Sequence, residues 1–251
     1  MCLIVLAYRQ HPRYRLIVAA NRDEYYRRPT APAHFWPDHP VVLAGRDLEQ
    51  QGTWLGISRT GRFAALTNYR DPTAVLPSAK SRGALVSDYL CGGESPAGYL
   101  AGVNRTGATY NGFNLLIGDA AELLFYSSRT GSAAAVSPGI HGLSNHVLDT
   151  PWPKVVRAKA ALAELLAANS DISTDDLFDM LQDTGAVPDA LLPNTGVGAE
   201  WERILAPIFI VSPDYGTRSS TVLLQEYSGR VLFVERNVTG QREQSFRFDV
   251  G

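Results

Sequence analysis

The sequence predicts an α+β protein built from antiparallel sheets with helices packed outside them. Strand-like apolar runs cluster near both ends of the chain, whereas helix-like segments fall in two inner blocks. Repeating βαβ units would instead alternate strands and helices throughout. The chain has 251 residues, of which 45% are hydrophobic and 19% charged, and this composition suits a large folded domain rather than a disordered chain. We expect one domain over residues 1–251.

The first two predicted strands form a hairpin. Residues 3–8 and 15–20 are apolar runs, and the polar stretch between them contains Pro12, a pattern typical of a hairpin between buried strands. The other predicted strands cover residues 63–67, 113–118, 122–127, 207–212, 221–226, 231–237 and 246–250.

The clearest predicted helix covers residues 153–168, because apolar residues recur at helical spacing after a proline start. A second helix is predicted at 175–183, and weaker helical patterns cover 83–91 and 96–103. Residues 189–198 combine Pro, Asn and Gly, so they are predicted to form a loop that serves as a lid or rim.

Charge and hydropathy exclude several classes of partner. Lys and Arg number 23 against 25 Asp and Glu, a net charge of −2, which is too near neutral for whole-surface attraction to nucleic acid or an anionic membrane. No apolar run approaches the roughly 20 residues of a bilayer span, and the first run is too short for a signal peptide. Cys2 and Cys91 are the two cysteines, too few for a zinc-ligand pattern. We expect a cytoplasmic protein without nucleic-acid partner, membrane segment, metal or other cofactor, and the oligomeric state is left open.

Cys2 is the residue with the clearest chemical potential. Initiator methionine is removed when the second residue is small, so we expect the mature chain to start with a free α-amino group on Cys2. The reference pKa is about 7.7 to 8.0 for that amine and about 8.5 for the thiol, so the amine can accept the thiol proton near neutral pH. The alternative is that Cys2 is a small apolar residue at the start of a strand.

The hairpin also predicts what lies opposite Cys2. A turn centred on residues 11–12 sets Cys2 against residue 20 or 21, so the polar cluster 21–24 begins beside the thiol. Directly paired side chains lie about 4.5 to 5.5 Å apart, so the charged members of this cluster can bond the ammonium or orient an incoming group. The same cluster would also suit an ordinary strand end.

Short motifs are spread along the whole chain. They are Met1-Cys2, Asn21-Arg22-Asp23-Glu24, Arg27-Arg28-Pro29, Gly52-Thr53-Trp54-Leu55-Gly56, Leu66-Thr67-Asn68-Tyr69-Arg70, Gly112-Phe113-Asn114-Leu115, Gly142-Leu143-Ser144-Asn145 and Thr217-Arg218-Ser219-Ser220-Thr221. Together they resemble the NRDE family, also called the Transport and Golgi Organization family. That family is similar to N-terminal nucleophile hydrolases of the choloylglycine hydrolase and penicillin V acylase type. The resemblance implies a four-layer α/β/β/α sandwich of antiparallel sheets, with the nucleophile at the start of an inner strand.

Position by position, the resemblance implies a catalytic set. Cys2 matches the nucleophile, and Asp23 matches the aspartate that holds its amino group. Asn68 and Asn145 resemble the two amides that donate hydrogen bonds to the oxyanion. Arg218 matches an arginine near the nucleophile.

The chain departs from the acylases at one position. They typically carry Arg-Asn-x-Asp, whereas this chain has Ala20-Asn21-Arg22-Asp23. Positions 20 and 22 share a face of a strand, so Arg22 can supply a cation about 7 Å from the usual place. We therefore expect substrate choice to differ, with Asn21 and Arg22 binding substrate together with the aromatic Trp54 and Tyr69.

The predicted activity is that of an N-terminal-cysteine amidohydrolase, which cleaves the C–N bond of a small acyl amide other than a peptide. The thiol attacks the carbonyl carbon, its own amine shuttles the proton, and water releases a thioester. A Cys/His pair of Cys2 and His146 is the alternative chemistry.

A non-catalytic haem or lipid carrier is the alternative function. Six arginines lie in the first 28 residues, and arginine binds carboxylates such as haem propionates bidentately. The resemblance adds a link to secretory-pathway organisation and haem handling in animals. Such a carrier would use an apolar cleft, with Cys2, His141 or His146 as axial ligand. The expected ligand is thus a small acyl amide or an anionic apolar molecule.

Overall fold

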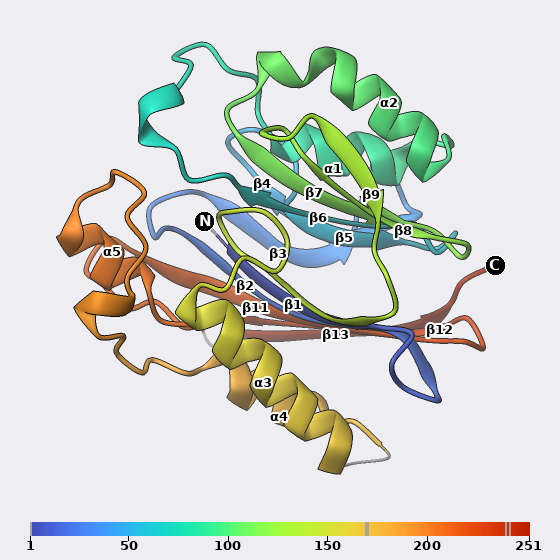
Figure 1. Ribbon diagram of the computed structural model, residues 1–251. Coiled ribbons are helices and arrows are strands. Elements are labelled where there is room, and N and C mark those ends of the chain that lie inside the picture. The colour runs from blue at the N-terminus through green and yellow to red at the C-terminus, as the bar shows by residue number, and fades with distance from the viewer. Residues whose placement is uncertain (1, 169–170, 239, 241) are drawn as a thin grey trace. The chain divides into compact units, whose positions relative to one another are not determined.

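The computed structural model describes residues 2–168, 171–238, 240 and 242–251, and of Cys2 it describes the backbone. The chain divides into two compact units, residues 1–27 with 138–247 and residues 28–137 with 248–251. Each unit is built on an antiparallel sheet with its own helices (Figure 1), so the predicted α+β class is confirmed. Because the first unit draws on both ends of the chain, no single cut in the sequence separates the two. The single domain expected over 1–251 stays a prediction.

The first unit is built on a six-stranded sheet in the order β10-β1-β2-β11-β12-β13. Its strands are β1 (Cys2–Tyr8), β2 (Tyr14–Tyr25), β10 (Gly139–Leu143), β11 (Tyr215–Glu226), β12 (Arg230–Asn237) and β13 (Arg242–Asp249). Its helices are α3 (Pro153–Ala168), α4 (Thr174–Leu181), the short η3 (Asp189–Leu191) and α5 (Ala199–Leu205).

The two faces of this sheet differ in chemistry because side chains alternate along a strand. One face packs on α3 and α4, which lie side by side in Figure 1, and its core includes Leu3, Val5, Ile17, Val222 and Val234. The opposite face carries the other residues of the same strands, and at the end where β1 begins several of these are polar. The candidate site lies at this polar end, on the face opposite α3 and α4.

The second unit is built on a seven-stranded sheet in the order β3-β4-β5-β6-β7-β8-β9. Its strands are β3 (Thr30–Phe35), β4 (Val42–Asp47), β5 (Leu55–Ser58), β6 (Phe63–Asn68), β7 (Phe113–Gly118), β8 (Leu123–Ser127) and β9 (Ser132–Ala135). Its helices are η1 (Pro72–Ala74), α1 (Gly83–Cys91), α2 (Pro96–Thr106) and η2 (Gly107–Thr109). An apolar core that includes Trp36, Tyr89 and Phe113 lies between this sheet and helices α1 and α2.

Gly56 has a packing role in this second unit. A Cβ atom at Gly56 would lie 2.7 Å from the Cβ of Ala44 and 2.8 Å from a methyl of Leu90 in α1. Because protein interiors are close-packed, no larger side chain fits there without moving the helix. The motif that contains Gly56 is therefore explained in part by how closely α1 lies on β5.

Most elements predicted from apolar patterns are confirmed. Residues 83–91 and 153–168 are helices over the predicted bounds. The helix predicted at 96–103 continues to residue 106, and the helix predicted at 175–183 covers residues 174–181. The strand prediction at 207–212 is wrong: its amide groups bond elsewhere, as when Phe209 N–H donates to the Asp183 carbonyl at 2.8 Å. Strands β3, β4, β5, β9 and β10 and helix α5 were not predicted. No helix within the described ranges is long and apolar enough to cross a bilayer.

Candidate active site

The register of the first hairpin places Cys2 directly opposite Arg22. The predicted partner, Ala20 or Asn21, is wrong, because the turn is centred on Pro12. The Arg9 N–H donates to the Arg15 carbonyl at 2.8 Å, which closes the loop symmetrically about that proline. The observed register therefore places Arg22, a cation, directly opposite Cys2.

A row of residues continues from this pair across the sheet. Arg22 of β2 pairs with Ser219 of β11, and Ser219 pairs with Asn237 of β12. Directly opposite residues share a face, so Arg22, Ser219 and Asn237 point to the same side, away from α3 and α4. Arg22 is 5% exposed and Ser219 is 3% exposed. A buried polar row therefore begins at Arg22, the residue directly opposite Cys2 in the register.

The polar cluster 21–24 is part of a strand, because β2 runs through it to Tyr25. Its neighbour is the Thr-Arg-Ser-Ser-Thr motif at 217–221 in β11. Asp23 pairs with Thr217, whose hydroxyl donates to the Asp23 carboxylate at 2.7 Å and accepts from the Ile210 N–H at 2.9 Å. Two motifs 194 residues apart thus lie side by side at one end of the sheet, and the carboxylate of Asp23 is buried there.

Arg218 is the bulged residue between these paired positions. The register of β11 against β2 shifts between Thr217 and Ser219, and an extra residue of this kind redirects side chains next to active sites. The Arg218 guanidinium donates to the Tyr25 carbonyl at 2.9 Å. Burial lowers the pKa of Arg218, and the Glu24 carboxylate opposes that shift. Arg218 lies at the same end of the sheet as Cys2, and its catalytic role stays a prediction.

Asn21 makes contacts that differ from those expected of a substrate-binding residue. Its side chain lies on the helix side and is 1% exposed. The amide NH2 donates to the carbonyls of Leu181 and Ile208, each at 2.9 Å, and its oxygen accepts from the Ser220 hydroxyl at 2.7 Å. These bonds tie β2 to the end of α4 and to β11, so the geometry favours a structural role for Asn21.

Asn145 lies on the loop that leaves β10, at the end of the sheet where β1 begins. It is fully buried, and its side-chain oxygen accepts from the Ser144 hydroxyl at 3.4 Å. The glycine of the same motif has a packing role, because a Cβ atom at Gly142 would lie 2.7 Å from Val155 of α3. The motif therefore combines a close strand–helix contact with a buried amide.

Asp149 closes the loop that carries Asn145. Its N–H donates to the Gly142 carbonyl at 2.8 Å, and its carboxylate accepts from the Gly142 N–H at 3.0 Å. The same carboxylate accepts from Lys159 at 2.6 Å and is 2.7 Å from Nδ1 of His141. Partial burial raises the pKa of Asp149, but the bonds from His141, Lys159 and Gly142 outweigh it and hold that pKa at about 2.

We expect the free energy of unfolding to fall as the pH drops from about 4 to about 2, because a carboxylate with a depressed folded-state pKa loses its stabilising bonds on protonation. Asp149→Asn should be less stable than the parent protein at pH 6, and the difference should shrink towards pH 2. Urea unfolding of both proteins across this range measures the effect. An equal difference at both ends of the range would contradict it.

The ring of His146 contacts the side chain of Thr150. Nδ1 of His146 lies 2.8 Å from the Thr150 hydroxyl, which also lies 2.8 Å from the Val147 carbonyl oxygen. Burial lowers the pKa of His146. The pairing of His146 with the Cys2 thiol, the alternative chemistry, stays a prediction because the Cys2 side chain lies outside the described residues.

Three predicted site residues belong to the second unit. Asn68 is the last residue of β6, Tyr69 follows it, and Trp54 precedes β5. Because β5 and β6 are antiparallel neighbours, all three lie at one end of the seven-stranded sheet. The ring of Tyr69 also lies 5.4 Å from the Arg129 guanidinium. Their roles in catalysis and substrate binding stay predictions.

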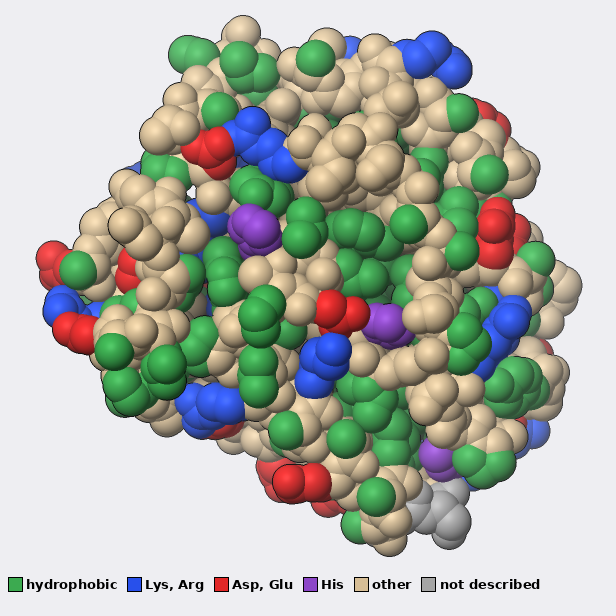
Figure 2. Space-filling view, in the orientation of Figure 1, with side chains coloured by type: hydrophobic (Ala, Val, Ile, Leu, Met, Phe, Trp, Pro, Cys, Tyr) green, Lys and Arg blue, Asp and Glu red, His purple; other side chains and the backbone are tan. Residues whose placement is uncertain are grey.

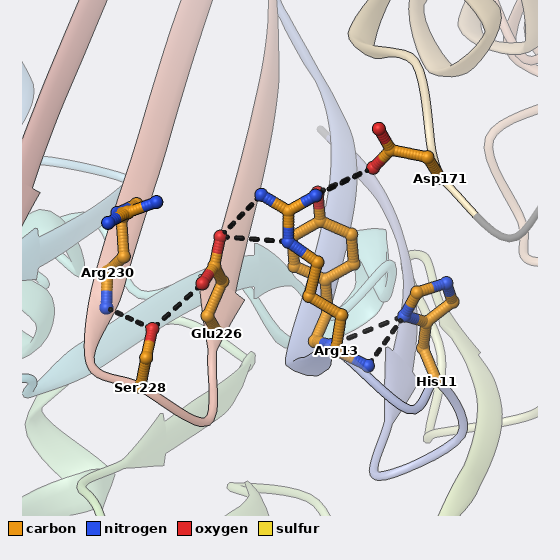
Figure 3. A network of polar contacts seen from close by, with 7 residues as sticks. His11, Arg13, Asp171, Glu226, Ser228 and Arg230 are labelled. Atoms are coloured by element: carbon orange, nitrogen blue, oxygen red, sulfur yellow. Dashed lines mark hydrogen bonds and ion pairs between the residues drawn. The ribbon is translucent and has the colours of Figure 1, made fainter.

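Two of the N-terminal arginines expected to serve an anionic ligand bind acidic side chains of the protein instead. Arg13 bonds Glu226 at 2.8 Å and Asp171 at 2.9 Å, as Figure 3 shows. Arg28 bonds Asp47 at 2.7 Å in the second unit. These two guanidinium groups are engaged by acidic side chains, which weakens the case for a haem carrier.

Within the described part of the chain, no cluster of three or more His, Cys, Asp or Glu side chains could hold a metal ion. The face shown in Figure 2 carries acidic and basic side chains interspersed with hydrophobic ones rather than a continuous basic area.

The sequence did not predict site roles for several residues of the polar face. Beside Ser219 and Asn237, the next row inward contains Thr221 and Glu235, which pair with each other and are 2% and 1% exposed. Buried acidic and hydroxyl side chains on alternate positions of strands are unusual. This alternation in β11 and β12 is the sequence signal that could have found them.

Comparison with known protein sequences identifies the family of this chain. The family model of Transport and Golgi organisation 2 matches residues 1–240. The chain is 38% identical over 260 residues to the Transport and Golgi organization protein 2 homolog of Bos taurus, covering 96% of this chain and 94% of that protein. The Homo sapiens homolog is 36% identical over 258 residues, covering 95% and 93%.

Among solved structures, a C2A mutant of the conjugated bile acid hydrolase from Clostridium perfringens matches with a TM-score of 0.56 and 9% identity. The match covers 98% of this chain and 92% of that one. At this identity the likeness shows the fold alone, which is the N-terminal nucleophile hydrolase fold that the motifs implied. The motif resemblance is likewise confirmed, and the chain belongs to the Transport and Golgi organisation 2 family.

Proposed function

We propose that this protein is an N-terminal-cysteine hydrolase that acts on carbon–nitrogen bonds of small acyl amides other than peptides. The observation that carries the proposal is the buried polar row of Arg22 and Ser219, in which Arg22 pairs directly with Cys2. Buried polar groups are costly, and proteins retain them chiefly where they serve a structure or a site. The hydrolase fold supports the same conclusion.

Each residue of the first unit has a defined task in this proposal. After removal of Met1, which lies outside the described residues, the α-amine of Cys2 accepts the thiol proton. The thiolate attacks the carbonyl carbon of the substrate amide, and the C–N bond breaks. The α-amine then returns the proton to the nitrogen of the substrate, which leaves as a free amine. Water then hydrolyses the thioester. Asp23 holds the ammonium form of the amine, and Asn145 donates to the oxyanion.

Intact-mass spectrometry tests the proposal directly. We expect the purified protein to lack Met1 and to gain one acyl group when it is mixed with an activated acyl donor such as a nitrophenyl ester. A retained methionine, or a protein that no acyl donor modifies, would leave the proposal without support.

The two asparagines give a graded test of the same mechanism. Loss of one oxyanion donor typically costs about 2.7 to 4 kcal/mol, so Asn145→Ala should lower kcat on the order of a hundredfold with little change in KM. Asn68→Ala tests the prediction for the second unit in the same way. Steady-state kinetics on an anilide substrate would separate kcat from KM, and an unchanged kcat for either variant removes that residue from the mechanism.

A further inference from the structure

Two neighbouring serines of β11 differ in how their hydroxyl groups are satisfied. Ser220 is 5% exposed, and its hydroxyl donates to the Asn21 amide oxygen at 2.7 Å. Ser219 is 3% exposed, and among the described residues its Oγ has no hydrogen-bond partner. Nearly all buried polar side-chain atoms in folded proteins are bonded, so an exception needs an explanation.

The position of Ser219 supplies that explanation. The bulge between Thr217 and Ser219 sets the register of this residue, and the register places Ser219 opposite Arg22, which is itself opposite Cys2. Ser219 is therefore two strands away from Cys2 and next to Arg22 in the buried row. Adjacent strands lie about 4.8 Å apart, so this separation is roughly 10 Å.

We propose that Ser219 is a substrate-contacting, specificity-determining residue whose hydroxyl bonds an oxygen-bearing substituent of the amide that Cys2 attacks. Arg22, between the two, adds a cation beside the path of that substituent. After allowance for a hydrogen bond of about 2.8 Å, the substituent and the attacked carbonyl are separated by roughly the length of a three- to five-carbon chain. The inference rests on the proposed function and adds the class of substrate: an acyl amide with a distal carboxylate or hydroxyl group.

The first arm of the test needs no substrate. Removal of a buried hydroxyl that has no partner should be neutral or stabilising, whereas removal of one that has a partner is costly. We expect Ser219→Ala to leave the thermal midpoint unchanged or raised, and the matched control Ser220→Ala to lower it by roughly 2 to 4 °C. A fall in the Ser219→Ala midpoint as large as that of the control would overturn the proposal.

The second arm measures binding in the Cys2→Ala background, so that no chemistry is required. The probes are the glutaryl, 5-hydroxypentanoyl and hexanoyl anilides, whose acyl chains end in a carboxylate, a hydroxyl and a methyl group. We expect an oxygen-bearing probe to bind more tightly than the hexanoyl anilide. Adding Ser219→Ala should weaken that probe about tenfold and leave the hexanoyl anilide unchanged. Comparison of the glutaryl and 5-hydroxypentanoyl anilides shows whether Ser219 prefers a carboxylate or a hydroxyl group.

The outcomes separate this inference from the proposed function. Equal binding of the three probes, or a Ser219→Ala effect that is the same for all of them, overturns the inference while acylation of Cys2 still supports the hydrolase. If Ser219→Ala weakens only the oxygen-bearing probes and Cys2 is never acylated, the binding site is supported and the hydrolase function is rejected.

Discussion

Replacement of Cys2 by alanine is expected to abolish acylation of the protein and with it all turnover of acyl amides. The reason is that, in the proposed mechanism, the Cys2 thiol supplies the bonding electron pair and the amine of the same residue supplies the base, so the variant lacks the nucleophile. Cys2→Ser should retain the amine but acylate far more slowly, because a hydroxyl is a weaker nucleophile. Mass spectrometry after incubation with a nitrophenyl ester measures both variants.

Cys91 provides the matched control for this experiment. It is the last residue of α1 in the second unit, and burial raises the pKa of its thiol, an effect that Asp88 and Asp38 reinforce. A raised pKa leaves less thiolate at neutral pH, so Cys91→Ala should acylate like the parent. An adduct that persists in Cys2→Ala and disappears in Cys91→Ala would show that Cys91 is the reactive residue, and it would contradict the mechanism.

The parts of the fold that could be predicted are those with a strong local pattern. Helix α3 has apolar residues at helical spacing after a proline, and strands β1 and β2 each contain a continuous apolar run. Local patterns fix such elements because a single buried face determines the periodicity. The missed strands lack this signal: β3 contains Pro32 within six residues, and β9 is an exposed run of a serine and three alanines. Their pairing with neighbours decides their conformation instead.

The site was predictable in composition and less so in geometry. The sequence placed a polar cluster beside Cys2, but it could not place the turn to one residue, and a shift of this size changes which side chain faces the nucleophile. It also could not show that the cluster continues inside strand β2, because four polar residues resemble a strand end. The satisfied bonds of Asn21 and the unsatisfied hydroxyl of Ser219 depend on partners in β11, α4 and the segment before β11, and no local pattern records such contacts.

Replacement of Asn21 by alanine is expected to destabilise the protein rather than to change its substrate preference. The variant leaves the Leu181 and Ile208 carbonyls without their amide donor and the Ser220 hydroxyl without its acceptor, all in a buried environment. Each orphaned group costs about 1 to 3 kcal/mol, and partial relaxation recovers some of this. We expect a loss of about 4 kcal/mol in the free energy of unfolding, measured by urea denaturation.

The size of this loss, compared with that of Ser220→Ala, separates the two roles of Asn21. Ser220→Ala removes one of the three bonds and should cost about 1 kcal/mol, so a structural Asn21 makes the two variants differ several-fold in the same assay. A substrate-binding Asn21 would instead leave the unfolding midpoint near that of the parent and raise KM. Because the amide bridges residues 160 to 199 positions away along the chain, its loss should also increase hydrogen exchange at the end of α4, where a change confined to substrate contacts would have no effect.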